Sequence, residues 1–351
     1  MEHASTRARV GDHNVPRQME LKREVQTAEI LDPRRDFQPT PTSVEVRWDP
    51  LIGYSSRIVA GASFLPPSDF DLEAFGRQTA ENCFFCAPRL EAVTPKFPAA
   101  LISEGRIHRG EAVLFPNIQA YSLYSSVSVY SPNLHYMPLK SVAASIVADN
   151  LGAQVDFLAR AARYDSTARW ASINANHMLP SGSSLFHPHL QGSLDRHPTI
   201  VQELLARVPA DRFRDYLNTE KLLGQRYLGR LGSVDWLTSF APFGFNELRA
   251  FVPSVASPVQ LSQAYVQDLA EGITRALRFY GELGFECFNL AIYGAPPETD
   301  GYMLSLRLVC RSNLQHLYRS DVAYFERLHW QAMVDSTPEE LAQKAGDRFR
   351  G

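Results

Sequence analysis

His187-Pro188-His189-Leu190-Gln191 is the most informative stretch of this sequence. Two histidines separated by one residue point to the same side of an extended backbone. The proline between them restricts its own φ angle and so holds that spacing. One imidazole can therefore be offered to a metal ion while the other faces a substrate.

A polar, glycine-containing segment precedes these histidines, from Asn174 to Ser184. Such a loop is able to present hydrogen-bond donors to an anion. A histidine directed at a phosphorus atom beside a loop of this kind is typical of nucleotidyl transfer through a phosphohistidine. The simpler interpretation, in which His187 and His189 are only exposed strand residues, does not explain the whole spaced set.

Length and composition indicate a globular protein. The chain has 351 residues, of which 45% are hydrophobic and 21% are charged, as expected for a chain with a substantial core. The formal charge of −3 and the pI near 6.4 give no support to a nucleic-acid or membrane-surface partner. No apolar run reaches the roughly 18 residues of a membrane helix, and no signal-peptide stretch is recognised, so we expect a cytoplasmic protein.

The four cysteines fall into two groups. Four cysteines in a chain of this length do not make a disulfide scaffold. In a reducing compartment the close pair Cys83 and Cys86 is expected to bind a metal ion or to be redox-active. Cys287 and Cys310 lie in apolar, strand-like runs and are expected to be buried free thiols.

One order of secondary-structure elements is predicted twice: strand, strand, helix, strand, loop, strand. The first copy comprises strands at 112–117 and 126–130, a helix at 139–163, and strands at 170–174 and 187–192. The second comprises strands at 235–240 and 247–252, a helix at 262–283, and strands at 287–293 and 302–309. The pattern predicts an internal duplication and an α+β fold, with antiparallel sheets and helices packed outside.

The expected domain organisation has three parts: an N-terminal arm at 1–43, a first half at 44–200, and a second half at 201–351 that includes a connector. The arm is rich in charged residues and has no sustained apolar period, so we expect it to be mobile or loosely docked. The connector, residues 202–231, is predicted to be helical. Thr337-Pro-Glu-Glu predicts a C-terminal helix, because Thr is a good N-cap and acidic residues favour the first turn.

Ser305 and Arg307 stand in the second copy where the first has His187 and His189. The leucines at 304, 306 and 308 predict a buried face, which places Ser305 and Arg307 together on the other one. Arg307 is then expected to be a surface arginine. If its face lines a cleft instead, the guanidinium needs an acid or a phosphate as partner and could bind the phosphate of an acceptor.

The spaced motif resembles galactose-1-phosphate uridylyltransferase and its relatives, the transferase branch of the histidine-triad (HIT) superfamily. The residues that reproduce the family motif are Asn176, Gly182, Ser184 and His187 to Gln191. The final Gln distinguishes this branch from the triad hydrolases. Further matches lie, in the right order, at Arg47–Gly53, Asn82–Cys86, Phe115–Asn117, Tyr130–His135 and, weakly, 325–340. The resemblance covers most of the chain after residue 44 and implies a duplicated HIT-like fold.

The resemblance also implies the roles of individual residues. His189 would be the nucleophile, and Gln191 would bind a non-bridging oxygen of the covalent intermediate. Ser184 and the backbone near Gly182 would bind the displaced phosphate. The remaining substrate-binding residues carried over from the family are Phe115, Asn117, Asn176, Glu326 and Gln331.

One structural zinc ion is implied by the same resemblance. Its ligands would be Cys83, Cys86, His135 and His187, a donor set that suits a closed tetrahedral site. The ion would tie the N-terminal turn to the strand that directs His189. The family's second metal site uses histidines, but this sequence has Tyr293, Ser305 and Arg307 at the matching positions, so no second metal is expected.

Departures from the family leave the substrate open. The lysine and tyrosine of the family's sugar-phosphate loop are missing, and Ile118 replaces the acidic residue after Asn117. The first hypothesis is a ping-pong nucleotidyltransferase that moves a nucleoside monophosphate between a nucleotide sugar and a sugar 1-phosphate. The second is a nucleotide-sugar phosphorylase or hydrolase, and the third is a non-catalytic, zinc-stabilised nucleotide-binding protein, which the intact His189 and Gln191 disfavour. Relatives are commonly dimers, so the resemblance also implies a homodimer.

Overall fold

Two β-sheets and eight α-helices are formed by residues 18–317 and 319–350, the part of the chain that the computed structural model describes. The strands are β1 (Arg23–Asp32), β2 (Gln38–Trp48), β3 (Ser55–Ile58), β4 (Ile107–Arg109), β5 (Ala112–Pro116), β6 (Tyr124–Val129), β7 (Trp170–His177), β8 (His189–Asp195), β9 (Tyr227–Leu231), β10 (Val234–Thr238), β11 (Phe245–Val252), β12 (Phe288–Tyr293), β13 (Leu304–Cys310) and β14 (Ala332–Val334). The helices are α1 (Leu72–Ala80), α2 (Arg89–Val93), α3 (Ala144–Tyr164), α4 (Ile200–Ala206), α5 (Arg212–Leu223), α6 (Gln263–Glu282), α7 (Tyr324–Leu328) and α8 (Pro338–Ala345).

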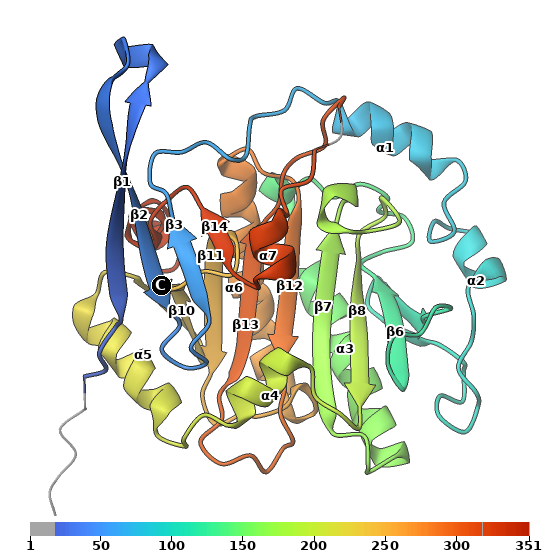
Figure 1. The fold of residues 1–351 in the computed structure, drawn as a ribbon. Helices are drawn as coiled ribbons and strands as arrows, with labels where there is room; N and C mark the ends of the chain where they lie inside the picture. The colour runs from blue at the N-terminus through green and yellow to red at the C-terminus, as the bar shows by residue number, and fades with distance from the viewer. Residues whose placement is uncertain (1–17, 318, 351) are drawn as a thin grey trace, which may run out of the picture.

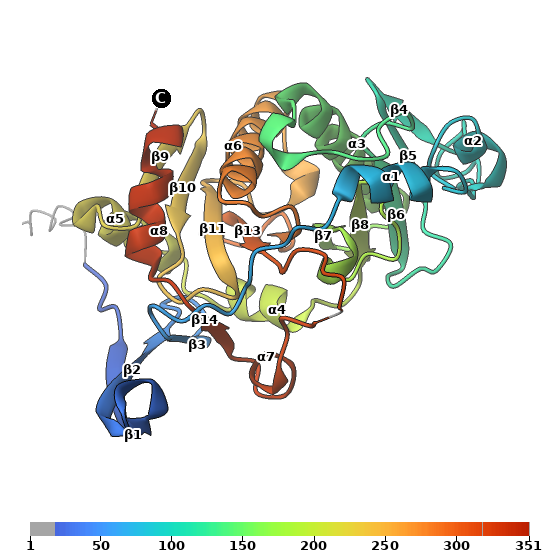
Figure 2. The ribbon, with the colours of Figure 1, turned by 90° about the horizontal axis from the view of Figure 1, so that it is seen from above.

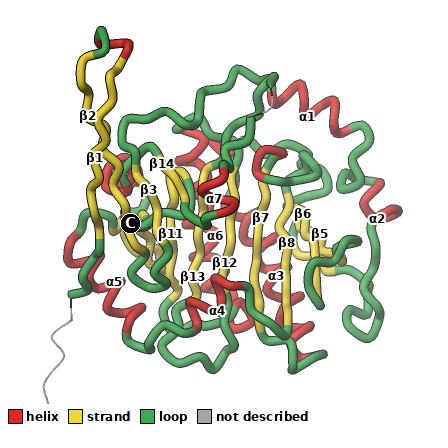
Figure 3. The backbone as a smooth tube through the Cα atoms, in the orientation of Figure 1, coloured by secondary structure: helices red, strands yellow, loops and turns green. Residues whose placement is uncertain are grey.

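The larger sheet has the strand order β4-β5-β6-β8-β7-β12-β13-β11-β10-β9. Read from each end toward the centre, the two halves of this order are the same, which is the arrangement of an internal duplication. All neighbouring strands are antiparallel, and the halves meet where β7 pairs with β12. Figure 3 shows these strands as one continuous layer. The α+β fold with a duplicated antiparallel sheet is therefore confirmed, while the domain boundary at 200/201 stays a prediction.

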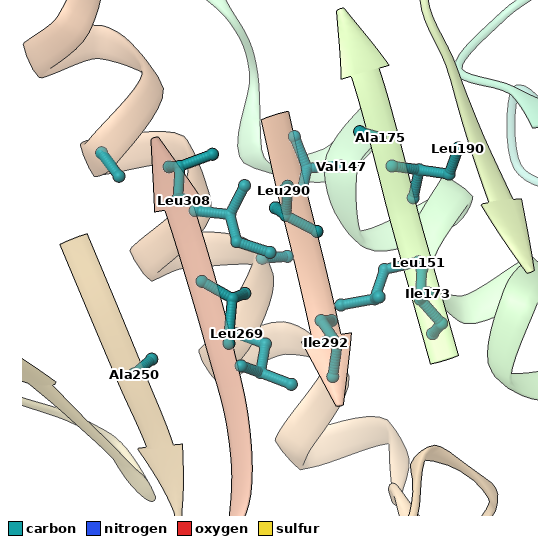
Figure 4. Packing of buried hydrophobic residues seen from close by; sticks show 14 of the residues in the cluster. Val147, Leu151, Ile173, Ala175, Leu190, Ala250, Leu269, Leu290, Ile292 and Leu308 are labelled. Carbon is teal, nitrogen blue, oxygen red and sulfur yellow. The ribbon is translucent and has the colours of Figure 1, made fainter. Parts of the chain in front are cut away.

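The two faces of the larger sheet differ in character. Helices α3 and α6 cover one face, whereas α4, α7, β3 and β14 lie on the other side (Figures 1 and 2). Because side chains alternate along a strand, every second residue points to the helices and is apolar. The packed residues include Val147 and Leu151 of α3, Leu269 of α6, and Ile173, Leu290 and Leu308 of the central strands (Figure 4). Each such burial stabilises the fold by about 1.5–3 kcal/mol, and it leaves the polar alternate residues on the opposite face.

A buried glutamine on α3 holds β8 in place. Gln154 accepts a hydrogen bond from Ser126 Oγ at 2.8 Å and donates to Ser128 Oγ at 2.7 Å. Its Nε2 also donates to the carbonyl of Leu190. Gly192 faces this side chain, and a Cβ at that position would overlap Gln154 Oε1. The missing side chain at 192 therefore lets β8 approach the helix closely.

The turn at Asp49 connects parts of the chain that are far apart in sequence. Asp49 Oδ2 accepts hydrogen bonds from Arg249 at 2.9 Å and from Arg307 at 2.6 Å. The neighbouring Arg47 is buried and pairs with Glu339 of α8 at 2.9 Å. These ion pairs attach the small sheet to the second half of the larger one. The predicted C-terminal helix is confirmed, with Thr337 and Glu340 forming a capping box.

Two segments differ from the sequence expectation. Residues 23–48 form a two-stranded hairpin that projects from the body, and its strand β2 runs across the expected boundary at 43/44 (Figure 1). Most residues of the hairpin are exposed on both faces, so its sequence has no apolar alternation from which the strands could be predicted. Residues 1–17 of the expected arm lie outside the described residues. The prediction of a helical connector at 202–231 is wrong at its C-terminal end, because residues 227–231 form β9 and pair with β10.

None of the helices in the described residues combines the length and the apolar character needed to cross a membrane.

Candidate functional site

Four candidate metal ligands come together from three separate segments. Cys83 and Cys86 lie in the turn between α1 and α2, His135 follows β6, and His187 lies two residues before the start of β8. Their ligand atoms all lie within 4.8 Å of one another. His187 Nδ1 is 3.7 Å from Cys83 Sγ and 3.4 Å from Cys86 Sγ, and His135 Nδ1 is 3.2 Å from Cys86 Sγ.

These distances fit one tetrahedral metal ion. With metal–sulfur bonds of about 2.3 Å and metal–nitrogen bonds of about 2.0–2.1 Å, the sulfur–nitrogen edge of a tetrahedron is roughly 3.5 Å. His187 Nε2 donates to the carbonyl of Ser131 at 3.0 Å, and His135 Nε2 meets Thr79 Oγ1 at 2.9 Å. Both Nδ1 lone pairs therefore remain available to an ion. Burial, with a further contribution from Cys83, raises the pKa of the Cys86 thiol to about 12, so Cys86 needs a neighbouring cation to be held as a thiolate.

His189, the candidate nucleophile, is the first residue of β8 and is 8% exposed. Its Nδ1 lies 2.9 Å from the carbonyl oxygen of His187. A carbonyl only accepts, so Nδ1 carries the proton of the neutral ring and Nε2 keeps a lone pair. Burial lowers the pKa of His189, with the hydrogen bond to His187 opposing the shift, so the neutral form is favoured.

Phe85 joins the metal turn to the nucleophile. Its ring stands edge-on to that of His189, with centroids 5.5 Å apart, and to that of His187 at 6.0 Å. On its other side it contacts Phe115 at 5.2 Å. Phe115 is 2% exposed, so this predicted substrate-binding residue packs against Phe85. The Cys-x-x-Cys turn thus carries two candidate metal ligands and packs against the candidate nucleophile.

A cleft of about 440 Å³ lies on the polar face of the central strands. Its floor is formed by residues of β7, β8, β12 and β13, and two loops contribute Tyr121 and Phe243. The polar and charged strand residues of the lining are Asn174, Asn176, Gln191, Ser193, Asn289, Tyr293 and Arg307. His189 precedes Gln191 by two residues and so lies on the same face of β8. The structure therefore brings Gln191, Asn176 and Arg307 together in the cleft. His189 is the residue before Gln191 on the same face of β8.

The predicted anion-binding loop follows β7. Gly182 has φ of +91°, a left-handed conformation that favours glycine, and it ends the short 3₁₀ turn Leu179–Ser181. Ser184 is exposed in this loop. A Cβ at Gly182 would lie 3.9 Å from Asn176 Nδ2, so the amide of Asn176 borders the loop. Within the described residues, the buried Nδ2 of Asn117 has no hydrogen-bond partner, although Asn117 Oδ1 accepts from Gln119 N at 3.1 Å.

Arg307 is not the surface arginine that the leucine pattern favoured. It is 3% exposed, and its guanidinium pairs with Glu247 and Asp49, each at 2.6 Å. It also lies 3.7 Å from the ring centroid of Phe243. Burial opposes its charge, but Glu247 and Asp49 outweigh that effect and raise the pKa of Arg307. The turn at Asp49 covers this part of the strand, which is why the polar face is buried here.

Glu326 and Gln331 are not among the residues that line the cleft. Glu326 accepts backbone hydrogen bonds from Ala323 at 2.9 Å and Met333 at 3.1 Å. Gln331 accepts from Arg57 Nε at 2.7 Å and donates to Ser55 Oγ at 2.6 Å. In this chain both side chains therefore hold α7 and β14 against β3.

Sequence reasoning missed several residues of the site, chiefly Phe85, Tyr121 and Asn289. Phe85 lies inside the Cys-x-x-Cys motif, so its position was visible although its contact with His189 was not. Asn289 belongs to the second copy of the strand that carries Asn174 and Asn176, and the internal repeat was the available signal. Tyr121 follows no pattern in the sequence.

Comparison with known proteins gives one relative in sequence and several in structure. No protein-family model matches the chain. An uncharacterised protein of Archaeoglobus fulgidus is 30% identical over 338 residues, which cover 93% of this chain and 98% of that protein.

Solved structures with the same fold are more distant in sequence. An ADP-glucose phosphorylase from Arabidopsis thaliana with bound ADP-glucose has a TM-score of 0.64 at 16% identity, covering 87% of this chain and 99% of its own. A galactose-1-phosphate uridylyltransferase-like protein from the same plant has a TM-score of 0.63 at 15% identity, covering 86% and 98%. A uridylyltransferase has a TM-score of 0.57 at 18% identity, covering 86% and 98%. The chain thus belongs to the family of the Archaeoglobus protein and has the fold of the ADP-glucose phosphorylase, the galactose-1-phosphate uridylyltransferase-like protein and the uridylyltransferase.

Proposed function

We propose that this protein is a nucleotidyltransferase that moves a nucleoside monophosphate from a nucleotide sugar through a covalent intermediate on His189. The observation that carries the proposal is the hydrogen bond from His189 Nδ1 to the carbonyl of His187, which leaves Nε2 as a free nucleophile. A polar cleft with Gln191 and Asn176 lies beside it, large enough for part of a nucleotide sugar.

In the first half-reaction, Nε2 of His189 attacks the α-phosphorus of the nucleotide sugar. A nitrogen–phosphorus bond forms as the bond to the leaving phosphate oxygen breaks, and the sugar 1-phosphate departs. The imidazole becomes positively charged, and the hydrogen bond from Nδ1 to His187 stabilises that charge. Gln191 and Asn176 would donate hydrogen bonds to the phosphate oxygens.

In the second half-reaction, a phosphate oxygen of the acceptor attacks the same phosphorus. The nitrogen–phosphorus bond breaks and returns the lone pair to Nε2, which restores the neutral ring. No net proton transfer to the protein is needed, because Nδ1 keeps its proton throughout. The acceptor in this proposal is a sugar 1-phosphate.

We propose that the metal is zinc, held by Cys83, Cys86, His135 and His187. Two thiolates and two imidazoles at tetrahedral distances are the donor set of a structural zinc site. Bound zinc would supply four fixed bonds and no reactive position. Those bonds would hold His187, and with it the carbonyl that orients His189.

A second candidate function is a nucleotide-sugar phosphorylase, in which inorganic phosphate takes the place of the sugar phosphate. The observation that favours it is the engagement of Glu326 and Gln331 in hydrogen bonds away from the cleft. Arg307, the remaining cationic residue of the cleft lining, is already neutralised by two carboxylates.

The test is mass spectrometry of the intact protein after incubation with UDP-, ADP- and GDP-sugars. We expect the mass of one nucleotidyl group to be gained with one of these donors, located on His189 by peptide mapping. The labelled protein is then divided between hexose 1-phosphate and inorganic phosphate, and the acceptor that removes the label distinguishes transferase from phosphorylase. A protein that forms product without ever carrying the label would contradict the covalent mechanism.

A further inference from the structure

A chain of four side chains links the C-terminal half to Asn176 in the cleft. Asp321 accepts hydrogen bonds from Nε and Nη2 of Arg311. Arg311 Nη1 donates to Asn289 Oδ1 at 2.6 Å. Asn289 Nδ2 in turn donates to Asn176 Oδ1 at 2.7 Å. Asn289 and Asn176 are paired residues of β12 and β7, where the two halves of the sheet meet.

The chemistry of this chain fixes which way each amide points. An ionised carboxylate only accepts, and a guanidinium only donates, so Asn289 must turn its oxygen to Arg311. Its Nδ2 then faces Asn176 and also donates to the carbonyl of Ser181 at 2.9 Å, which only accepts. Two independent partners therefore require the same orientation of Asn289. Asn176 must consequently present its oxygen to Asn289 and its NH₂ group elsewhere.

The free NH₂ group of Asn176 borders the loop at Gly182. The amide nitrogen lies 3.9 Å from the position a Cβ would take on Gly182. Asn176 is partly exposed and lines the cleft. A donor in this place suits a phosphate oxygen, whereas the amide oxygen in the same place would repel it.

We propose that Asn289 is a positioning residue, which sets the amide of Asn176 so that its NH₂ group faces the phosphate of the nucleotide. Arg311 and Asp321 hold Asn289 in turn. This inference rests on the proposed function for the identity of the ligand, but the orientation of the amide is a property of the free protein. It makes the second half of the chain, which lacks the paired histidines, necessary for the site in the first half.

The substitution that tests the proposal is Asn289→Asp, which keeps the shape and the contact with Arg311 but removes the donor. A carboxylate at this position would accept from the NH₂ group of Asn176, so the amide of Asn176 should turn over and direct its oxygen at the phosphate. Because the new carboxylate also meets the carbonyl of Ser181, Asn289→Ala serves as a second variant that introduces no charge. Asn218→Asp on α5 makes the same charge change outside the cleft lining and is the matched control.

The first measurement is the side-chain amide spectrum of the ¹⁵N-labelled protein without ligand, with the Asn176 signal assigned by its loss in Asn176→Ala. In the unsubstituted protein the two amide protons should exchange rapidly with water. In Asn289→Asp they should shift and exchange more slowly, because they are donated to a carboxylate. An Asn176 signal that is the same in Asn289→Asp as in Asn218→Asp would overturn the proposal, whatever the enzyme's activity.

The second measurement is the rate at which His189 is labelled by the nucleotide sugar. We expect Asn289→Asp to slow labelling about tenfold or more, the effect of losing one hydrogen bond to a charged group. Asn289→Ala should slow it less, since the amide is then free to take either orientation. In the Asn176→Ala background both substitutions should have no further effect.

Equal losses in both backgrounds would show that Asn289 acts on the fold and not through Asn176, and would overturn the proposal. Absence of any label in the unsubstituted protein would reject the covalent mechanism instead, and the amide spectrum would still decide the orientation of Asn176.

Discussion

The last strands of the two halves, β8 and β13, have the same place in the sheet but use it differently. Strand β8 begins with His189, whose ring is neutral and keeps one nitrogen free. Strand β13 carries Arg307, whose guanidinium is held by Glu247 and Asp49. Both side chains are buried; Arg307 lines the cleft, and His189 lies two residues before Gln191, which also lines it.

The difference follows from what covers each strand. Phe85 and the metal ligands cover the start of β8, so His189 meets an apolar ring and one backbone carbonyl. The turn at Asp49 covers β13 and brings a carboxylate to Arg307. His189 thus keeps an unpaired Nε2, whereas Arg307 forms ion pairs that join the small sheet to the large one. The sheet thus contains two equivalent strands, and the segments that cover them leave the candidate nucleophile of β8 unpaired at Nε2 while they place Arg307 of β13 in ion pairs.

Replacing the nucleophile should have the largest effect on activity. We expect His189→Gly to lower nucleotidyl transfer at least about 10³-fold, because the proposed covalent bond forms on His189 Nε2. Thermal stability and metal content should stay close to those of the unsubstituted protein, since His189 Nε2 is not used by the fold. A nucleotidyl-imidazole supplied in solution should restore some product by filling the vacated volume. Near-normal activity of His189→Gly would show that His189 is not the nucleophile.

Replacing the equivalent arginine should instead weaken the fold. Arg307→Met leaves Asp49 and Glu247 facing a buried site without this cation, and we expect a loss of about 3–5 kcal/mol in the free energy of unfolding. Urea denaturation measures this loss. Arg77→Met, which removes an exposed arginine from an i,i+4 pair, is the control and should change stability by less than about 0.5 kcal/mol.

Arg307→Met also separates the structural role from an acceptor-binding role. If the guanidinium bound the acceptor phosphate directly, KM for the acceptor would rise while labelling of His189 continued at its normal rate. We expect no such selective rise, because both carboxylates already occupy the guanidinium. A stable variant with a raised acceptor KM would show that Arg307 binds the acceptor.

Of the two strands compared, only β8 should be affected by loss of the metal. The expected loss of stability is somewhat smaller than for Arg307→Met. Cys86→Ser should lower the metal content from about one ion per chain to nearly none and destabilise the protein by about 2.7–4.1 kcal/mol, the linkage expected at a free-metal level 100 to 1,000 times the Kd. Elemental analysis and thermal unfolding measure the two effects. Cys287→Ser changes a buried thiol outside the cluster and should leave the metal content intact. A protein equally stable with and without metal would contradict the structural assignment.

The smallest effect is expected where β8 meets α3. Gly192→Ala places a methyl group against Gln154, and such overpacking typically costs about 1–3 kcal/mol. Gly224→Ala is a matched control for the loss of glycine, because a Cβ there meets nothing within 4 Å although its φ of +63° adds some backbone strain. Equal unfolding free energies for the two variants would mean that Gln154 does not hold β8.

The residues that resemblance and spacing could predict are those whose role is set by local chemistry. The Cys-x-x-Cys pair, His135 and His187 form a cluster, as the family resemblance implied. The order of strands and helices was also predictable, since it follows from apolar periodicity along each segment. The hairpin at 23–48 was not, because exposed strands lack that periodicity.

The remaining parts of the site depend on contacts between distant segments. The leucine pattern of β13 correctly separated two faces but could not show that the second face is covered. Asp49, which pairs with Arg307, lies 258 residues away in sequence. Likewise, the link between Asn289 and Asn176 depends on the register of β12 against β7, which a single strand sequence does not contain.

The sequence by itself therefore determined most of the strand and helix pattern through its apolar periodicity, and through its family resemblance it indicated the candidate metal donors and the candidate nucleophile. Only the tertiary structure decided that Arg307 is buried between two carboxylates, that Glu326 and Gln331 are used away from the cleft, and that Asn176 turns its NH₂ group to the loop. The physical reason is that hydrogen bonds and ion pairs are directional and short. Which partners meet is set by sheet register and by the segments that fold over the sheet, and these arise from the packing of the whole chain.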